Sequence, residues 1–397
     1  MVANKVYFRN RISRYNSGQV LTVVDNNGEI YEGNYTFYEI WSMLDGHNSV
    51  HEIISYFKNK YNNFDSEEIE CDIMCIFEEM IKYGLISEDR TISPQIIHTS
   101  NQILSVHIAI TSNCNLQCKH CYLDNKSKSS ISLDEYLTIL KELSSIGVLT
   151  LEISGGEPLT HRNFLEFIRL AKLYGFYIKL FTNATLIDAN VINDIKEYVD
   201  SFRVSLDGAI ATHNLRRGKG TYEKTFSALQ LLKNCNVQVS MTVDDINCHD
   251  IREVKIITEQ LGHKFEASPV VPYSHIEFSY DKLKAIHKII NQEFVGENQK
   301  RANFRGANCE AGCSLLYISS ELNVTPCPLL HQKKWQMGNL KNKSIIEILN
   351  SANYREIMSL LGDLKSKCIK CNKCQFWCAA IIEQTPDRIS PFCIKCL

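Results

Sequence analysis

Between residues 105 and 271, short apolar runs rich in β-forming residues alternate with helical patterns, and this alternation limits the fold more than any other feature. Six such units in succession predict a parallel sheet, either open or closed into a partial barrel. In both arrangements, ligands bind at the carboxyl ends of the strands. The expected strands are 105–110, 149–153, 177–182, 202–206, 237–243 and 265–271, and the expected helices are 132–146, 162–174, 186–198, 222–234 and 249–261.

The N-terminal region has a different pattern. Two alternating runs within 18–33 flank a polar turn at 25–28 and predict a hairpin. Amphipathic helical patterns then cover three segments: 36–44, 49–61 and 66–83. A hairpin followed by three helices predicts a winged-helix-like α+β domain over 1–90, and the polar stretch 91–103 is expected to be a linker.

Composition excludes several classes of function. The 397 residues carry a net charge of −2, but residues 1–100 alone hold 8 Lys and Arg against 15 Asp and Glu. This acidic excess argues against nucleic-acid binding by the N-terminal region. No apolar run approaches the ~18 residues of a membrane helix, and the N-terminus has no signal-peptide core. We therefore expect a cytoplasmic protein with neither a membrane nor a nucleic-acid partner.

Cysteine is the unusual residue type, because a cytoplasmic protein with many grouped cysteines generally uses them for metal binding or redox chemistry. Twelve of the sixteen cysteines lie within 114–121 and 309–396. The other four are scattered and are expected to be small buried hydrophobic side chains: Cys71, Cys75, Cys235 and Cys248.

The first cysteine group follows the expected strand 105–110 directly. Cys114, Cys118 and Cys121 have the spacing C-x3-C-x2-C, so one loop offers three thiolates to a 4Fe–4S cluster and leaves the fourth iron open. An open coordination position is what a catalytic metal site needs. The alternative is a zinc site completed by His120 or a distant ligand.

This spacing resembles the signature of the radical S-adenosylmethionine (SAM) superfamily, which implies a partial (β/α)6 radical SAM barrel over 104–300. In that family, a turn like Gly155-Gly156-Glu157 after the second strand binds the methionine amine of SAM. Glycines allow close backbone approach and a carboxylate pairs with an ammonium group. The resemblance also implies that Tyr122 binds the cofactor.

Two further segments carry the same resemblance. Ser205 and Asp207 match family residues whose polar side chains lie near the SAM ribose and carboxylate, and Arg217 matches an arginine near that carboxylate. Asn214 stands where the family usually has Asp. Asn183 and Asn247 also follow strands, with weaker specificity. The implied cofactors are SAM and a 4Fe–4S cluster, and the implied chemistry is hydrogen abstraction by a deoxyadenosyl radical.

The second cysteine group resembles the SPASM module of radical SAM enzymes, which implies two auxiliary 4Fe–4S clusters within 301–397. The run C-x2-C-x2-C-x3-C also has a ferredoxin spacing, whereas a zinc ribbon is the alternative. By resemblance, the first auxiliary cluster takes Cys309, Cys313, Cys327 and Cys378. The second takes Cys368, Cys371 and Cys374 with Cys393 or Cys396. The middle spacing is shorter than the family pattern, and one cysteine is left over.

Residues 5–88 resemble the leader-peptide recognition element of ribosomal-peptide maturases, which captures a peptide as an added strand. The resemblance as a whole implies a sactipeptide- or ranthipeptide-type maturase that links a cysteine sulfur to a carbon of a ribosomal precursor peptide. Carbon–carbon crosslinking and epimerisation are the alternatives, followed by sulfatase activation and haem-precursor chemistry. A flavodoxin or ferredoxin is the expected electron donor. The sequence names no catalytic acid or base.

Overall fold

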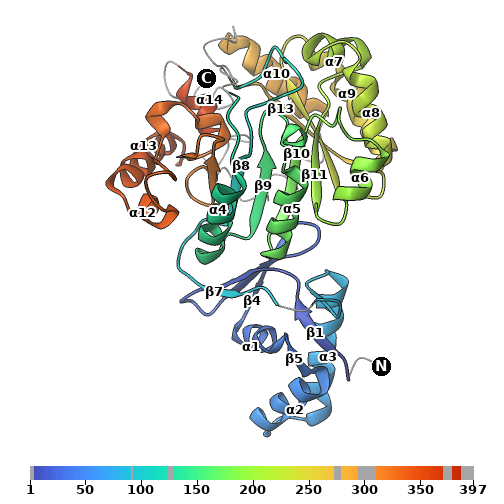
Figure 1. Ribbon diagram of the computed structural model, residues 1–397, viewed down its shortest axis with the longest axis vertical. Helices are drawn as coiled ribbons and strands as arrows, with labels where there is room; N and C mark the ends of the chain where they lie inside the picture. Colours follow the sequence, from blue (N-terminus) through green and yellow to red (C-terminus); the bar gives the residue numbers. More distant parts are fainter. Residues whose placement is uncertain are drawn as a thin grey trace. The chain divides into compact units, whose positions relative to one another are not determined.

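The computed structural model describes residues 4–90, 93–123, 128–271, 279–293, 309–369 and 378–385 (Figure 1). The chain forms two compact units. The first consists of Met1–Ser105, Asp134–Leu151 and Glu166–Ile178, and the second of the remaining segments.

The N-terminal domain contains the predicted hairpin and helices, so both predictions are confirmed. The hairpin strands pair antiparallel, and the Asp25 carboxylate closes the turn by accepting hydrogen bonds from the backbone N–H groups of Asn27 and Glu29, each at 2.8 Å. The α-helices are α1 (Tyr35–Met43), α2 (Val50–Lys60) and α3 (Ser66–Lys82). The strands are β1 (Val6–Arg9), β2 (Ser13–Tyr15), β3 (Leu21–Val24), β4 (Ile30–Gly33), β5 (Asp45–Ser49), β6 (Ile86–Ser87) and β7 (Ile96–His98).

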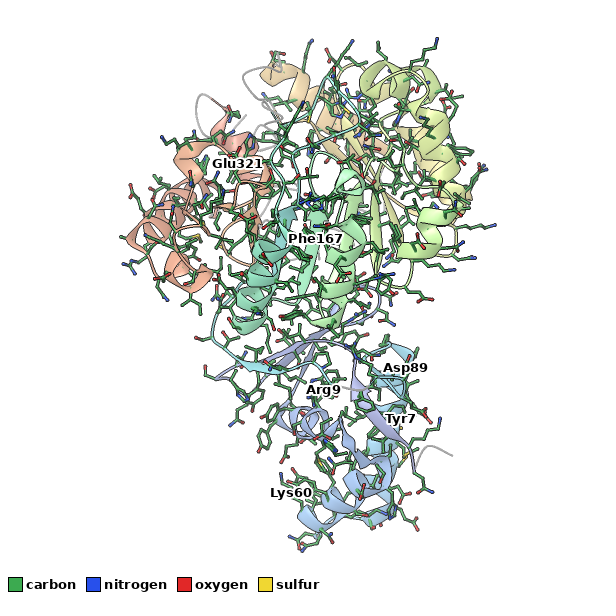
Figure 2. The ribbon with its side chains drawn as sticks, viewed as in Figure 1. Tyr7, Arg9, Lys60, Asp89, Phe167 and Glu321 are labelled. Atoms are coloured by element: carbon green, nitrogen blue, oxygen red, sulfur yellow. The ribbon has the colours of Figure 1, made fainter. Side chains whose placement is uncertain are left out.

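Each helix of this domain begins at a polar residue that satisfies exposed backbone N–H groups. Asn34 caps α1 and Asp65 caps α3. Ser49 and Glu52 form a reciprocal capping box at α2. These caps explain why three short helices start where they do. Figure 2 labels Lys60 at the end of α2, where its ammonium group contacts the Glu39 carboxylate at 2.5 Å.

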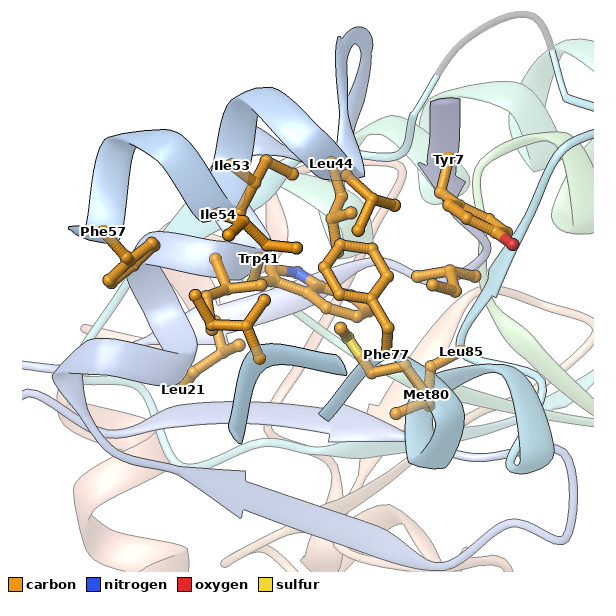
Figure 3. Close-up of a cluster of buried hydrophobic side chains, with 14 of the residues drawn as sticks. Tyr7, Leu21, Trp41, Leu44, Ile53, Ile54, Phe57, Phe77, Met80 and Leu85 are labelled. Carbon is orange, nitrogen blue, oxygen red and sulfur yellow. The ribbon is translucent and has the colours of Figure 1, made fainter. Parts of the chain in front are cut away.

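A single hydrophobic cluster holds this domain together, with Trp41 of α1 among its members (Figure 3). Trp41 is fully buried, and its indole N–H donates to the Ser13 hydroxyl at 2.8 Å. Phe57 from α2 and Phe77 from α3 are also buried in this cluster. Burying an aromatic side chain of this size stabilises a fold by roughly 3 kcal/mol or more.

The expected linker contains a strand. β7 pairs in parallel with β2, which gives the sheet order β4-β3-β2-β7, and a second sheet has the order β5-β1-β6. Ile96 and Ile97 supply the β-branched character that this pairing favours. Strand β4 therefore lies at one end of its sheet.

The six predicted strands of the central region are all present, and they are neighbours in sequential order within a larger sheet, β13-β12-β11-β10-β9-β8-β14-β15-β16. The pairs from β10 to β13 are parallel. The sequential order without a reversal is that of a barrel, and it confirms the predicted fold class. The strands are β8 (Ser105–Ala109), β9 (Thr150–Ser154), β10 (Tyr177–Thr182), β11 (Ser201–Ser205), β12 (Val237–Val243) and β13 (Lys264–Pro269).

Helices follow these strands as the sequence predicts. Figure 2 labels Phe167 on α5, whose ring stacks on Tyr136 of α4 with centroids 4.0 Å apart. The sequence did not predict helix α7, which follows β11. The helices are α4 (Leu133–Ser145), α5 (Phe164–Leu173), α6 (Ala189–Ile195), α7 (Ile210–Arg217), α8 (Thr221–Leu231), α9 (Ile251–Gln260) and α10 (Tyr280–Glu293).

The C-terminal region adds three short strands to the sheet beyond β8, and these pair antiparallel with one another. They are β14 (Leu315–Ile318), β15 (Asn323–Thr325) and β16 (Gly338–Asn339), and the helices are α12 (Ile345–Leu349), α13 (Ala352–Ile369) and α14 (Ala379–Glu383). No described helix has the length and apolar character that a bilayer crossing requires.

The expectation for the scattered cysteines is wrong. Cys71 and Cys75 on α3 are exposed, and Cys235 and Cys248 are only partly buried. The apolar side of α3 is formed by other residues, including Ile73, Phe77 and Met80, so the two α3 cysteines remain on its polar side.

Candidate cofactor site

The loop after β8 carries the first cysteine group and is fastened on two sides. Cys114, Cys118 and Cys121 are partly buried. On one side, the Asn115 side chain donates to the Thr185 hydroxyl at 2.8 Å and accepts from the Asn183 side chain at 3.0 Å. On the other side, the Lys119 backbone N–H donates to the Arg216 carbonyl of α7 at 3.2 Å. We call residues 114–121 the cluster loop.

The glycine turn after β9 packs directly against the chain that leads into the cluster loop. The backbone N–H of Gly156 donates to the Thr111 carbonyl at 2.8 Å, and that of Glu157 donates to the Asn113 carbonyl at 2.8 Å. A Cβ atom on Gly155 would lie 2.4 Å from the Thr111 oxygen, and one on Gly156 would lie 2.4 Å from the Asn113 oxygen. Only glycine fits at both positions.

The Glu157 carboxylate joins this turn to the end of β10. It accepts hydrogen bonds from the Thr182 hydroxyl and the Asn183 backbone N–H, both at 2.8 Å, and from the Leu159 backbone N–H at 3.3 Å. Burial raises the pKa of Glu157 to about 7, although these hydrogen bonds favour its charged form. A carboxylate offers about four acceptor positions, and donors in the described part of the chain use three of them, which leaves one for a cationic group.

Asp207 lies just beyond β11 and is completely buried. Its carboxylate accepts hydrogen bonds from Arg217 Nε at 2.5 Å and from the Thr242 backbone N–H at 2.9 Å, and His120 Nε2 lies 2.9 Å from it. Burial alone would raise the pKa of Asp207, but Arg217 and His120 hold it well below the usual range. The resemblance implies that Asp207 lies near the SAM ribose and carboxylate, and that role stays a prediction.

Arg217 connects this carboxylate to the cluster loop. Its Nη1 atom lies 4.0 Å from Cys118 Sγ, and its charge interacts with both Cys118 and Cys121. The expected neighbours of the cofactor, Arg217 and the cysteines, are therefore brought together.

Helix α7 also buries two side chains whose roles the sequence did not reveal. The Arg216 guanidinium forms an ion pair with Asp244 and donates to the Thr242 carbonyl at 3.0 Å. The His213 ring accepts a hydrogen bond from the Asp207 backbone N–H at 3.1 Å. Their separation of three residues is the only available signal, because it places both side chains on one face of a helix.

The remaining expected residues have different surroundings. Asn214 accepts hydrogen bonds from the Thr221 and Tyr222 backbone N–H groups at the start of α8. Ser205 is partly buried at the end of β11. The Tyr122 ring lies 5.7 Å from that of His331, and its hydroxyl is hydrogen-bonded to Tyr317. Asn247 donates to the Asp207 and Thr242 carbonyls.

A row of polar side chains crosses the middle of the strands, and the sequence analysis missed it. His107 contacts Glu152 through Nδ1 at 3.2 Å and the Ser154 hydroxyl through Nε2 at 2.5 Å. Burial would raise the pKa of Glu152, but its hydrogen bond with His107 and the charge of Lys179 hold it at about 2. The signal was a charged or histidine residue inside each of five strands: His107, Glu152, Lys179, Arg203 and Glu266. We call these five residues the polar wall.

In the second cysteine group, Cys309, Cys327 and Cys378 lie close enough to influence one another's pKa. Burial raises the pKa of Cys378 to about 12, so a bound cation would have to stabilise its thiolate. Cys313 interacts with Tyr354. Cys368 is described only as a backbone position in α13. Four expected ligands lie outside the described residues: Cys371, Cys374, Cys393 and Cys396.

The donor set fits iron–sulfur clusters. Within the described segments, no three His, Cys, Asp or Glu side chains converge on the position of a single metal ion. A 4Fe–4S cluster has no such requirement, since each thiolate binds a different iron. The buried Nδ1 atom of His120 has no hydrogen-bond partner among these residues, which leaves it available to a bound group beside the cluster loop.

Three protein-family profiles match the chain. The radical SAM superfamily matches residues 108–253, the SPASM iron–sulfur cluster-binding domain matches 309–375, and the coenzyme PQQ synthesis protein D (PqqD) matches 19–86. These domains indicate 4Fe–4S clusters and SAM as the cofactors.

Individual proteins resemble the chain over most of its length. The antilisterial bacteriocin subtilosin biosynthesis protein AlbA of Bacillus subtilis (strain 168) is 26% identical over 377 residues, covering 88% of this chain and 83% of that protein. The AdoMet-dependent heme synthase of Methanosarcina barkeri (strain Fusaro / DSM 804) is 27% identical and covers 72% and 94%. The crystal structure of Streptococcus suis SuiB bound to precursor peptide SuiA has a TM-score of 0.65, at 14% identity, and covers 98% of both chains. At that identity it shows a shared fold.

Proposed function

We propose that this chain, a radical SAM/SPASM enzyme with a PqqD-like N-terminal domain, forms thioether links between cysteine sulfur and carbon atoms of a ribosomal precursor peptide. The observation that supports this most directly is the combination of the cluster loop and glycine turn with a separate N-terminal domain. The cluster loop and the glycine turn suit SAM chemistry, and the N-terminal domain suits capture of a peptide.

We assign binding roles to the residues at the strand ends. Cys114, Cys118 and Cys121 would hold the SAM-binding cluster, and Gly155 and Gly156 would bring backbone carbonyls close to SAM. The free acceptor position of Glu157 would take the methionine ammonium.

The other expected contacts follow the family pattern. Ser205, Tyr122 and Arg217 would line the rest of the SAM site. When bound, the cluster and SAM supply the deoxyadenosyl radical that abstracts a hydrogen atom from the peptide.

The proposed reaction balances as a two-electron oxidation of the peptide. One C–H and one S–H bond break, and one C–S bond forms. A hydrogen atom goes to the deoxyadenosyl radical, the thiol proton goes to solvent, and one electron goes to an auxiliary cluster held by the second cysteine group. A flavodoxin or ferredoxin would supply the electron that cleaves SAM. This need for an electron acceptor gives the auxiliary clusters a role.

The N-terminal domain would bind the leader segment of the peptide. Strand β4 is a terminal strand of its sheet, so its outer edge can accept an added strand. The acidic excess of residues 1–100 favours a leader with lysine or arginine residues. AlbA is named for subtilosin biosynthesis and SuiB was solved with a precursor peptide, and these likenesses support a peptide substrate over a haem precursor. The domain limits 1–90, 91–103, 104–300 and 301–397 remain part of this proposal.

The intact mass of a candidate peptide tests the proposal. The enzyme would be co-expressed anaerobically, with iron–sulfur assembly support, beside any short peptide encoded next to it. We expect a loss of two hydrogens for each link, absent with the Cys114→Ala variant, and thiol alkylation should show that the peptide cysteines are consumed. A two-hydrogen loss with all thiols still free would indicate carbon–carbon links instead. An unchanged mass from an enzyme that contains clusters and cleaves SAM would refute crosslinking.

A further inference from the structure

One buried carboxylate contacts basic side chains from two separate elements. Asp207 contacts His120 from the cluster loop and Arg217 from α7. His120 lies between two of the expected cluster ligands, and Arg217 reaches within 4.0 Å of Cys118 Sγ. The same carboxylate therefore holds a side chain of the cluster loop and the guanidinium group that reaches Cys118.

Asp207 is rigid enough to act as an anchor. Its second carboxylate oxygen accepts from the Thr242 backbone N–H, its carbonyl accepts from the Asn247 side chain at 2.9 Å, and its own N–H donates to His213. These three additional hydrogen bonds fix the residue to β12 and α7, independently of the cluster loop. A side chain that contacts Asp207 is therefore held in place relative to β12 and α7.

We propose that His120, Asp207 and Arg217 form a positioning network that fixes the cluster loop and sets the reduction potential of the cluster held by Cys114, Cys118 and Cys121. This proposal rests on the proposed function, because it requires that cluster. It also gives Asp207 a role different from direct contact with the SAM ribose.

Arg217 and Asp207 should have opposite effects on the reduction potential of the cluster. Reduction adds negative charge to the cluster, so a guanidinium group beside Cys118 favours the reduced state. The Asp207 carboxylate accepts a hydrogen bond from Arg217 Nε and partly cancels that positive charge. Removing the positive charge should make reduction harder, and removing the negative charge should make it easier.

The test is an anaerobic redox titration of the full chain followed by electron paramagnetic resonance, using the signal that changes when SAM is added. Without SAM, Arg217→Gln should lower the equilibrium constant for reduction at least tenfold, which is 59 mV for a one-electron couple. Asp207→Asn should raise it by a similar factor. The matched control is Asp244→Asn, which breaks the neighbouring Arg216 ion pair and should change the constant less than threefold.

Two further variants separate charge from geometry. Arg217→Lys retains the positive charge, so its equilibrium constant for reduction should stay within threefold of the wild-type value, whereas that of Arg217→Gln should not. This comparison can be made even if Asp207→Asn does not fold. His120→Phe keeps a ring but removes the contact to Asp207. We expect it to lose iron to a chelator several times faster than the wild type does.

Shifts of the same sign in Asp207→Asn and Arg217→Gln, or no shift in either with full iron content, would overturn the proposal. So would an Asp207→Asn variant that loses SAM affinity at an unchanged potential, because that result assigns Asp207 to SAM binding directly. The proposed function would fail in a different experiment. A wild-type chain that binds no 4Fe–4S cluster, or that leaves the peptide unmodified, would refute it before any variant is made.

Discussion

Replacing Gly156 with alanine tests how tightly the glycine turn is joined to the cluster loop. The new Cβ atom would lie 2.4 Å from the Asn113 carbonyl oxygen and 2.6 Å from that of Ser112, distances that real Cβ atoms essentially never show. Both obstacles are backbone atoms, so no side-chain rotation relieves the contact. The turn and the chain leading into the cluster loop must separate by at least about 0.6 Å to reach the ~3.0 Å limit.

The expected cost follows from what that separation breaks. Overpacking costs roughly 1–3 kcal/mol, and two backbone hydrogen bonds span the same contact, from Gly156 to Thr111 and from Glu157 to Asn113, each worth about 1 kcal/mol. A loss of about 3–5 kcal/mol is therefore expected, which for a unit of this size lowers the melting temperature by roughly 6–20 °C. SAM affinity should fall at least tenfold, because the turn would move away from its ligand.

Thermal unfolding and SAM titration calorimetry of the reconstituted enzyme measure both effects. The matched control is Gly362→Ala on α13, where an added Cβ meets no atom within 4 Å. That change should leave SAM affinity unchanged and raise stability by up to ~1 kcal/mol, because alanine favours a helix over glycine. A Gly156→Ala enzyme that melts within 2 °C of the wild type and binds SAM normally would refute the reasoning.

Three other outcomes are expected. Because the pKa of Glu157 is about 7, its carboxyl group loses a proton as pH rises from 6 to 8. SAM affinity, measured at several pH values, should therefore rise about tenfold over that range. In the Glu157→Gln variant, the affinity should not change with pH. Trp41→Ala should destabilise the N-terminal domain by about 3–5 kcal/mol and increase its hydrogen exchange, whereas Tyr35→Ala, at a side chain 45% exposed, should change little. Cys378→Ser should remove about four irons per chain but leave SAM cleavage intact, by iron assay and product analysis.

Much of the fold could be predicted from apolar periodicity and turn chemistry. The six strands of the central sheet were evident because each buries an apolar run, and the hairpin was evident because Asp25 begins a polar turn between alternating runs. The three N-terminal helices start at the residues that cap them. In all these cases the signal lies within a few residues of the element it specifies.

The parts that were missed depend on contacts between distant segments. Helix α7 has no apolar stripe, because the side chains that it buries are His213 and Arg216, whose partners lie beyond β11 and β12. The short strand β7 depends on pairing with β2, which is more than 80 residues away. The contacts of the Asp207 carboxylate could not be predicted either, since its three partners come from three different elements.

The polar wall has a consequence for how this protein can diverge. Its charges come as oppositely charged partners, Lys179 with Glu152 at 3.3 Å and Arg203 with Glu266 at 2.6 Å. A substitution that removes one partner leaves the other uncompensated in a partly buried setting, which is more costly than losing both. Drift at these positions should therefore proceed through paired replacements, so that homologues differ here two residues at a time.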